Sequence, residues 1–261
     1  MHGPIKQTSL FLKYAMLRAR LAAVRGEPVV VASTHRTAST AVYRSLRMAI
    51  GSRVFKCHRL HEPLMSWNEP NPKVTPPGGV LRSGMPGDWA VLHGITRPKR
   101  PARFVFMVRD PIAVAASMAA LKPAEEGTAW PMVPPYSNAM TDWFDADVLP
   151  ALGWSPWNIP FDASRKAMLI DHEPWRILVL RADLDDRSKE RELSAFTGAT
   201  VRMVRINSAE QRGAGASHAK ACDRIRSLPD EIDRIHRSRL CSHFFTPDEL
   251  AAQRSRWLGQ S

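Results

Sequence analysis

The fold is decided by residues 29–49, VVVASTHRTASTAVYRSLRMA, which read as a buried strand, a tight polar turn and a helix in immediate succession. The run 29–32 is apolar and largely β-branched without alternation, which is typical of a strand covered on both faces of a parallel sheet. Apolar residues then recur at helical spacing from Val42, with Ser39 or Thr40 placed to cap the helix. Because the turn ends at the N–H groups and positive dipole of a helix N-terminus, it predicts an anion site, and a phosphate group is the expected anion.

The length and charge of the chain limit its fold class and the type of partner that it binds. With 261 residues the chain is long enough for one substantial α/β core, so we expect a single domain over 1–261 in which residues 1–27 form an N-terminal helical extension. The 37 Lys and Arg residues against 25 Asp and Glu residues give a net charge of +12, which favours a polyanion, an anionic nucleotide or an acidic surface as partner. No nucleic-acid-binding motif is found, and the basic clusters are as short as Arg97-Pro98-Lys99-Arg100.

The N-terminal region and the cysteines bear on location. Three cysteines are too few for a disulfide framework, and an odd number of cysteines cannot all be paired within one chain. Basic residues interrupt every apolar run that could form a secretory signal. No segment reaches the apolar length of a membrane span. These features predict a cytoplasmic protein without a transmembrane segment. Two interpretations of residues 8–25 remain open, an amphipathic basic helix in peripheral contact with a membrane and, as the favoured one, a helix packed on the edge of the sheet.

Strands and helices alternate along the rest of the chain, which favours a three-layer α/β fold built on a doubly wound parallel sheet. Loops are expected at 67–88 and 122–137, where proline and glycine recur. The predicted strands are 53–57, 89–93, 103–108 and 176–181. Helices are predicted from Pro111, with Asp110 as N-cap, over 139–149, over 186–196, and from about 218 onward, with Pro247 at a helix start. In the helix at 139–149 we expect four buried residues: Trp143, Phe144, Val148 and Leu149.

A second candidate anion site follows the strand at 103–108. Arg109 lies at the carboxyl end of that strand, and Ser117 lies eight residues later in the next helix. In a parallel sheet Arg109 and the turn that contains Arg36 face the same edge, where such sheets bind ligands. Because the planar guanidinium group binds phosphate or sulfate oxygens in bidentate fashion, the two sites together predict a ligand with two separated phosphate groups.

Other patterns limit the chemistry. The turn lacks the Gly-x-x-x-x-Gly-Lys-[Ser/Thr] pattern, whose lysine and hydroxyl serve the β/γ-phosphates and Mg²⁺, and this disfavours an ATPase or GTPase. His58-x-x-His61 has no further ligands at a recognisable spacing, so we predict no metal site. Structural interpretations also remain: a turn whose hydroxyls only cap a helix, and an ion pair between Arg109 and Asp110.

Both sites resemble those of sulfotransferases. Arg36-Thr37-Ala38-Ser39-Thr40 resembles the 5′-phosphosulfate loop of that family, with Ala38 where glycine is usual. Val108-Arg109-Asp110-Pro111 with Ser117 resembles its 3′-phosphate motif, including the interval from Arg to Ser. Similarity to the bacterial, sulfotransferase-like family named for capsular polysaccharide synthesis extends to Trp143-Phe144-Asp145, Pro160-Phe161-Asp162, Leu178-Val179-Leu180-Arg181 and His243-Phe244-Phe245-Thr246-Pro247.

The resemblance implies a P-loop-like sulfotransferase fold and a specific donor. The donor would be 3′-phosphoadenosine 5′-phosphosulfate, whose sulfuryl group passes in line to a hydroxyl or amine of a carbohydrate or secondary-metabolite acceptor, without a metal ion. The donor-binding residues that it implies are Arg36, Thr37, Ala38, Ser39, Thr40, Arg109 and Ser117, with Arg212 in the segment 211–215 as a third anion candidate.

Catalysis by such an enzyme needs a base for the acceptor. His58 and His61 are the best candidates, with Glu62 as an alternative, because histidine titrates near neutral pH and the strand before them should end beside the first strand. Arg36 would stabilise the leaving phosphate. Four tryptophans could line an acceptor pocket or belong to the core: Trp130, Trp143, Trp154 and Trp157.

Two rival functions stay open. One is an ATP-dependent small-molecule kinase on a P-loop-like scaffold, which the missing P-loop lysine disfavours. The other is a non-catalytic relative that holds a nucleotide or another polyanion on its basic surface. Nucleotide binding without Mg²⁺ would argue against the kinase, and binding without transfer would favour the non-catalytic protein.

Overall fold

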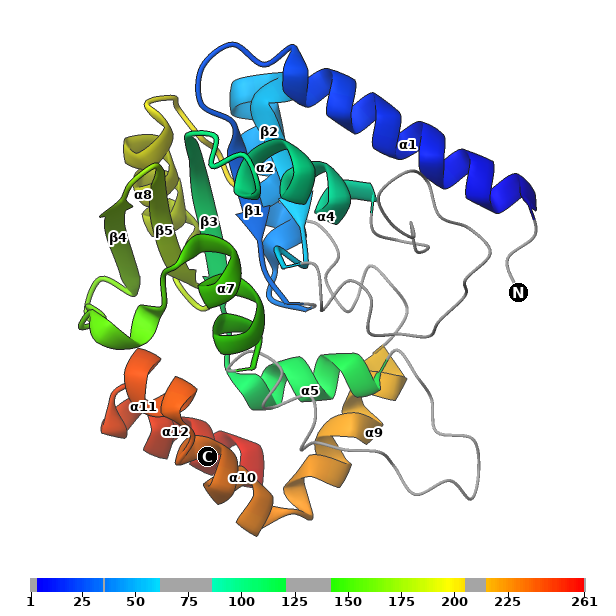
Figure 1. Ribbon diagram of the computed structural model, residues 1–261. Helices are drawn as coiled ribbons and strands as arrows, with labels where there is room; N and C mark the ends of the chain where they lie inside the picture. The colour runs from blue at the N-terminus through cyan, green and yellow to red at the C-terminus, as the bar shows by residue number, and fades with distance from the viewer. Residues whose placement is uncertain (1–3, 35, 62–85, 121–141, 205–214, 261) are drawn as a thin grey trace.

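The centre of the molecule is a five-stranded sheet in the order β2-β1-β3-β5-β4 (Figure 1). A computed structural model describes residues 4–34, 36–61, 86–120, 142–204 and 215–260. The strands are β1 (Val29–Ala32), β2 (Val54–Cys57), β3 (Ala102–Val108), β4 (Ala167–His172) and β5 (Trp175–Arg181). β1, β2, β3 and β5 are parallel, and β4 pairs antiparallel with β5 at the edge. The predicted α/β class is confirmed, and the sheet that was predicted to be parallel is parallel except for β4, a strand that was not predicted.

Helices cover both faces of this sheet, in keeping with three layers. Because strand side chains alternate between faces, Val31 packs with Val42 and Leu46 on one side, whereas Val30 and Ala32 point into the opposite core. The first face is covered by α2 (Ser39–Ile50) and α8 (Asp186–Thr197). The other face carries α4 (Pro86–Val91), the π-helical turn η2 (Leu92–Thr96), α5 (Pro111–Ala119), the π-helical turn η3 (Phe144–Val148) and α7 (Leu149–Leu152).

The C-terminal part of the described chain is helical, as predicted, and gathers beside α5 (Figure 1). Its helices are α9 (Gly215–Arg226), α10 (Pro229–His236), α11 (Arg239–Phe244) and α12 (Pro247–Leu258). Pro247 starts α12, where its missing N–H costs nothing. The short 3-10 turns are η1 (Gly51–Arg53) and η4 (Pro156–Asn158).

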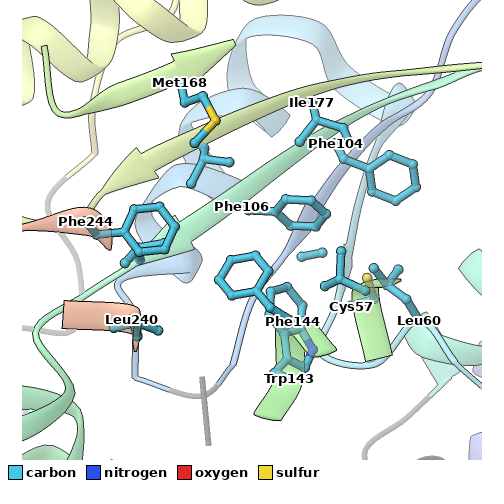
Figure 2. Packing of buried hydrophobic residues seen from close by; sticks show 14 of the residues in the cluster. Cys57, Leu60, Phe104, Phe106, Trp143, Phe144, Met168, Ile177, Leu240 and Phe244 are labelled. Carbon is cyan, nitrogen blue, oxygen red and sulfur yellow. The ribbon is translucent and has the colours of Figure 1, made fainter. Parts of the chain in front are cut away.

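Aromatic side chains join the sheet to these helices in the larger core (Figure 2). The ring of Phe106 on β3 lies 5.4 Å from that of Trp143 and 5.8 Å from that of Trp154, centroid to centroid. Phe144 stacks on Phe244 of α11 at 6.0 Å. Trp143 and Trp154 are buried, so they are core residues rather than the lining of an acceptor pocket. Trp157 is half-buried. Trp130 lies outside the described residues.

Several predicted elements are confirmed closely. The strands expected at 53–57, 103–108 and 176–181 are β2, β3 and β5, and the helix expected at 186–196 is α8. Asp110 caps α5 as predicted, because its carboxylate accepts a hydrogen bond from the backbone N–H of Ile112 at 2.8 Å. The helix expected over 139–149 is present from Asp142 and continues through η3 and α7 to Leu152.

Four predictions about local structure are wrong. Residues 86–88 are not part of a loop and residues 89–93 are not a strand. Both belong to α4 and η2, because Pro86 can begin a helix and a short apolar run fits either structure. Leu149 is 41% exposed, since the helix turns this position away from the core. Neither Ser39 nor Thr40 caps α2: the N-cap position is Ala38, and no side chain caps the helix.

The N-terminal helix α1 (Pro4–Ala22) packs on α4 and η2 beside the sheet edge, which confirms the favoured interpretation of residues 8–25. The Arg20 guanidinium donates to the carbonyl of Val54 on the edge strand β2 at 2.9 Å. The contact with η2 is close, because a Cβ on Gly94 would collide with Cδ2 of Leu21. Within the described residues, no helix combines the length and apolar character needed to cross a membrane.

The strand order places the candidate site. β2 lies on one side of β1 and β3 on the other, so the connection from β2 to β3 passes over β1. The strand order therefore reverses its direction at β1, and this position is the switch point of the sheet. Sheets of this kind bind ligands outside the carboxyl ends of the strands at such a switch point. The residues that directly follow β1 and β3 are those that the sequence analysis selected.

Candidate functional site

The turn after β1 has an unusual backbone. Arg36 has φ 68° and Ala38 has φ 63°, so two non-glycine residues lie in the left-handed region. This conformation costs a residue with a Cβ about 1–2 kcal/mol, and such strain concentrates at ligand sites. Ala38 therefore adopts the backbone that glycine favours. Alanine at this position does not prevent the turn from forming.

The two candidate anion sites adjoin each other. Arg36 donates from Nε and Nη2 to the backbone carbonyl of Ser117 at 3.2 and 3.1 Å, and Arg109 donates from Nη1 to the carbonyl of Arg36 at 2.8 Å. The residues are 81 and 73 positions apart in these pairs. The structure thus brings Arg36, Arg109 and Ser117 together at the switch point, as the shared sheet edge predicted.

Polar groups in the turn suit an anion. The hydroxyl of Thr37 donates to the carbonyl of Thr34 at 3.1 Å and closes the turn. The buried hydroxyl oxygens of Ser33 and Thr34 have no hydrogen-bond partner among the described residues. Buried hydroxyls are normally hydrogen-bonded, and the first turn of α2 has no side-chain cap. Phosphate oxygens could accept from the hydroxyls of Ser33 and Thr34 and from the N–H groups of that first turn.

Lys56 is a site residue that the sequence analysis missed. Its Nζ donates to Oγ1 of Thr40 in the first turn of α2 at 2.6 Å. Burial lowers the pKa of Lys56, because the charged ammonium group is desolvated. A cation at the positive end of a helix is unfavourable unless an anion lies between them. Strand alternation was the available signal, since Val54 and Lys56 share the face that α2 covers.

His58 lies beside the carboxyl end of β1, as predicted. Its Nδ1 is 2.8 Å from the backbone carbonyl of Ser33. Because a carbonyl oxygen only accepts hydrogen bonds, Nδ1 must carry the proton in this contact, and in the neutral ring Nε2 then has the lone pair. This is the tautomer that a general base needs.

Two buried carboxylates hold the backbone around His58. Asp88 of α4 accepts from the N–H of His58 at 2.6 Å, and Asp147 of η3 accepts from the N–H groups of Leu60 and His61. The indole of Trp143 donates to the carbonyl of His58 at 2.8 Å. The segment that carries the candidate base is therefore fixed from two helices. The sequence offered one signal, since Asp147 lies four residues after Trp143 on a buried helix face.

Burial changes the titration of both carboxyls. Desolvation raises the pKa of Asp88 to about 7, against an ordinary value of 3.8, although backbone N–H groups oppose the shift. Desolvation likewise raises the pKa of Asp147 to about 6. Each carboxyl therefore keeps its proton to a higher pH in the folded protein than in the unfolded chain.

Stability should depend on pH through Asp88. The folded state keeps this proton up to about pH 7, while the unfolded chain releases it near pH 4, so the free energy of unfolding falls as pH rises through that window. Asp88→Asn should reduce this fall, as measured by urea unfolding at a series of pH values. Asp230→Asn, which removes an exposed carboxyl, is the control. Equal pH dependence of Asp88→Asn and the unsubstituted protein would contradict the prediction.

The remaining candidates are less connected to the turn. The backbone of His61 is held by Asp147, and its buried Nδ1 has no partner within the described residues. Glu62 and Arg212 lie outside those residues. In the described part of the chain no three His, Cys, Asp or Glu side chains gather as a metal site would require.

These features define a three-layer α/β protein with a basic, hydroxyl-lined turn at the switch point of its sheet. Comparisons with protein-family models, with curated proteins and with solved structures found no match to the chain.

Proposed function

We propose that the protein is a sulfotransferase with a P-loop-like fold, which moves a sulfuryl group from 3′-phosphoadenosine 5′-phosphosulfate to a hydroxyl or amine of a carbohydrate or secondary metabolite in the cytoplasm. The observation that carries the proposal is the contact network of Arg36, Arg109 and Ser117 at the switch point. This network joins the two motifs that resemble the phosphosulfate loop and the 3′-phosphate site.

The donor, when bound, supplies a sulfur atom that the acceptor oxygen or nitrogen attacks while the bond to the 5′-phosphate breaks. The residues of the chain have separate tasks in this proposal. The N–H groups of the first turn of α2, with Arg36 and Lys56, bind the phosphate that leaves. Arg109 and Ser117 bind the 3′-phosphate. His58 receives the acceptor proton at Nε2, because the carbonyl of Ser33 holds the proton on Nδ1.

Calorimetry tests the proposal directly. The intact protein should bind 3′-phosphoadenosine 5′-phosphate in the absence of Mg²⁺, because the candidate site offers N–H groups, hydroxyls and side-chain cations to the phosphates. Failure to bind would overturn the proposal. Tighter binding of ATP with Mg²⁺ would support the kinase instead. Binding of the nucleotide without transfer of labelled sulfuryl groups to any saccharide or small-molecule acceptor would support a non-catalytic protein.

Lys56 gives a further prediction. Lys56→Met should weaken binding of 3′-phosphoadenosine 5′-phosphate by about tenfold or more, because a charge-assisted hydrogen bond contributes about 1.5–3 kcal/mol. Calorimetry measures the change. Lys99→Met removes the same charge from an exposed position away from the turn and is the matched control. Equal affinities of the two variants would show that Lys56 acts only through net charge.

A further inference from the structure

The outer face of α1 is apolar and exposed. Phe11 is 50% exposed, Leu12 59% and Met16 64%. Because a helix has 3.6 residues per turn, Ala15 and Ala19 lie on this same face. We name these five residues the α1 outer face. In Figure 1, α1 runs along the outside of the molecule with its other side toward α4. The packing on α4 and η2 therefore leaves the α1 outer face uncovered by any described residue.

Positive charge surrounds this face. The sequence of α1 contains Lys6, Lys13, Arg18 and Arg20 and no acidic residue, although Arg20 points inward to the carbonyl of Val54. Lys13 and Arg18 lie on opposite borders of the α1 outer face by helical periodicity. An apolar helix face bordered by basic residues is the pattern of a helix that lies in a membrane interface.

A second basic cluster extends the charge beyond the end of α1. Arg100 donates to the carbonyls of Leu21 and Val24 at 2.8 and 3.1 Å, which places the segment after η2 against the end of α1. Arg97 and Lys99 of that segment are exposed. Basic residues beside an amphipathic helix add electrostatic attraction to anionic lipid.

We infer that the α1 outer face binds the surface of an anionic lipid bilayer, with Phe11, Leu12 and Met16 in the acyl boundary and the basic residues at the headgroups. The charge favours this partner over a second copy of the chain. Two copies paired through this face would bring their basic borders together, and α1 has no carboxylate to compensate them. The inference is independent of sulfuryl transfer.

Vesicle flotation of the full chain tests the inference. The protein should float with vesicles of phosphatidylglycerol and phosphatidylcholine in equal parts, and binding should fall with added salt. It should not float with pure phosphatidylcholine. Replacing Phe11, Leu12 and Met16 together by serine should reduce binding about tenfold or more, because apolar burial drives insertion. Met48→Ser, at a methionine that is 77% exposed on α2, is the control and should bind like the unsubstituted protein.

Several outcomes would overturn the inference. The protein could fail to float with anionic vesicles, it could float equally well with anionic and neutral vesicles, or the triple variant could bind as strongly as the unsubstituted protein. Analytical ultracentrifugation tests whether a second copy of the chain occupies the face instead. If the unsubstituted protein is a dimer and the triple variant is a monomer, the α1 outer face is an interface between copies. Unchanged thermal unfolding of the triple variant would show that any lost binding does not come from misfolding.

Discussion

Replacing Arg109 with alanine is expected to weaken the binding of 3′-phosphoadenosine 5′-phosphate by about 10- to 150-fold, because one charge-assisted contact contributes about 1.5–3 kcal/mol. Arg36→Ala should have a similar or larger effect. Arg36 orients the turn through the carbonyl of Ser117 and also presents a guanidinium group at the end of β1. Calorimetry with the intact variants measures both changes.

The control for these variants is Arg44→Ala. Arg44 is exposed on α2, the helix that begins at the turn, so the substitution removes one positive charge without touching the contact network. We expect its affinity to stay close to that of the unsubstituted protein. Equal weakening by all three substitutions would mean that nucleotide affinity depends only on net charge. Unchanged affinity in Arg36→Ala and Arg109→Ala would show that the nucleotide does not bind at the turn.

The largest expected effect on stability is at Arg181. This residue ends β5 and is only 1% exposed. Its guanidinium donates to the carboxylates of Glu249 and Asp183, to each from two nitrogen atoms, and to the carbonyl of Phe244 at 3.0 Å. It also lies 4.3 Å from the ring centre of Phe245. A single buried side chain thereby fastens α11 and α12 to the sheet.

Arg181→Met should lower the free energy of unfolding by about 1.5–3 kcal/mol, because it removes charge-assisted hydrogen bonds at a buried position, while Lys166 stays paired with both carboxylates. Urea denaturation measures the change. Arg176→Ala on the same strand is the matched control, since its ion pair with Asp171 is solvent-exposed. The control should change the free energy of unfolding by less than about 1 kcal/mol. An Arg181→Met protein as stable as the control would contradict this account.

Much of the fold could be predicted because its central strands are unbroken apolar runs. β1, β3 and β5 are buried on both faces, and such unbroken apolar runs are typical of the inner strands of a parallel sheet. β4 could not be found in this way. It lies at the sheet edge, its residue Leu169 is 43% exposed, and its strand character depends on pairing with β5 rather than on its own composition.

The candidate site was predictable only where its residues directly follow a strand. Arg36 and Arg109 meet because the carboxyl ends of parallel neighbours share one edge. Lys56 and Asp147 were missed because their partners are set by packing. The ammonium of Lys56 reaches Thr40, 16 residues earlier, and Asp147 holds the backbone of His61, 86 residues away. Such contacts require knowledge of which helix covers which face.

The position of β3 between β1 and β5 has a consequence for synthesis on the ribosome. β1, β2 and β3 are complete once residue 108 has been made, but the strand that pairs with the open side of β3 begins only at Trp175. At about 5–20 residues per second, translation leaves this apolar strand unpaired for several seconds. An unpaired apolar edge recruits other chains. Expression in cells is therefore expected to depend on chaperones during that interval, more than the stability of the finished protein would suggest.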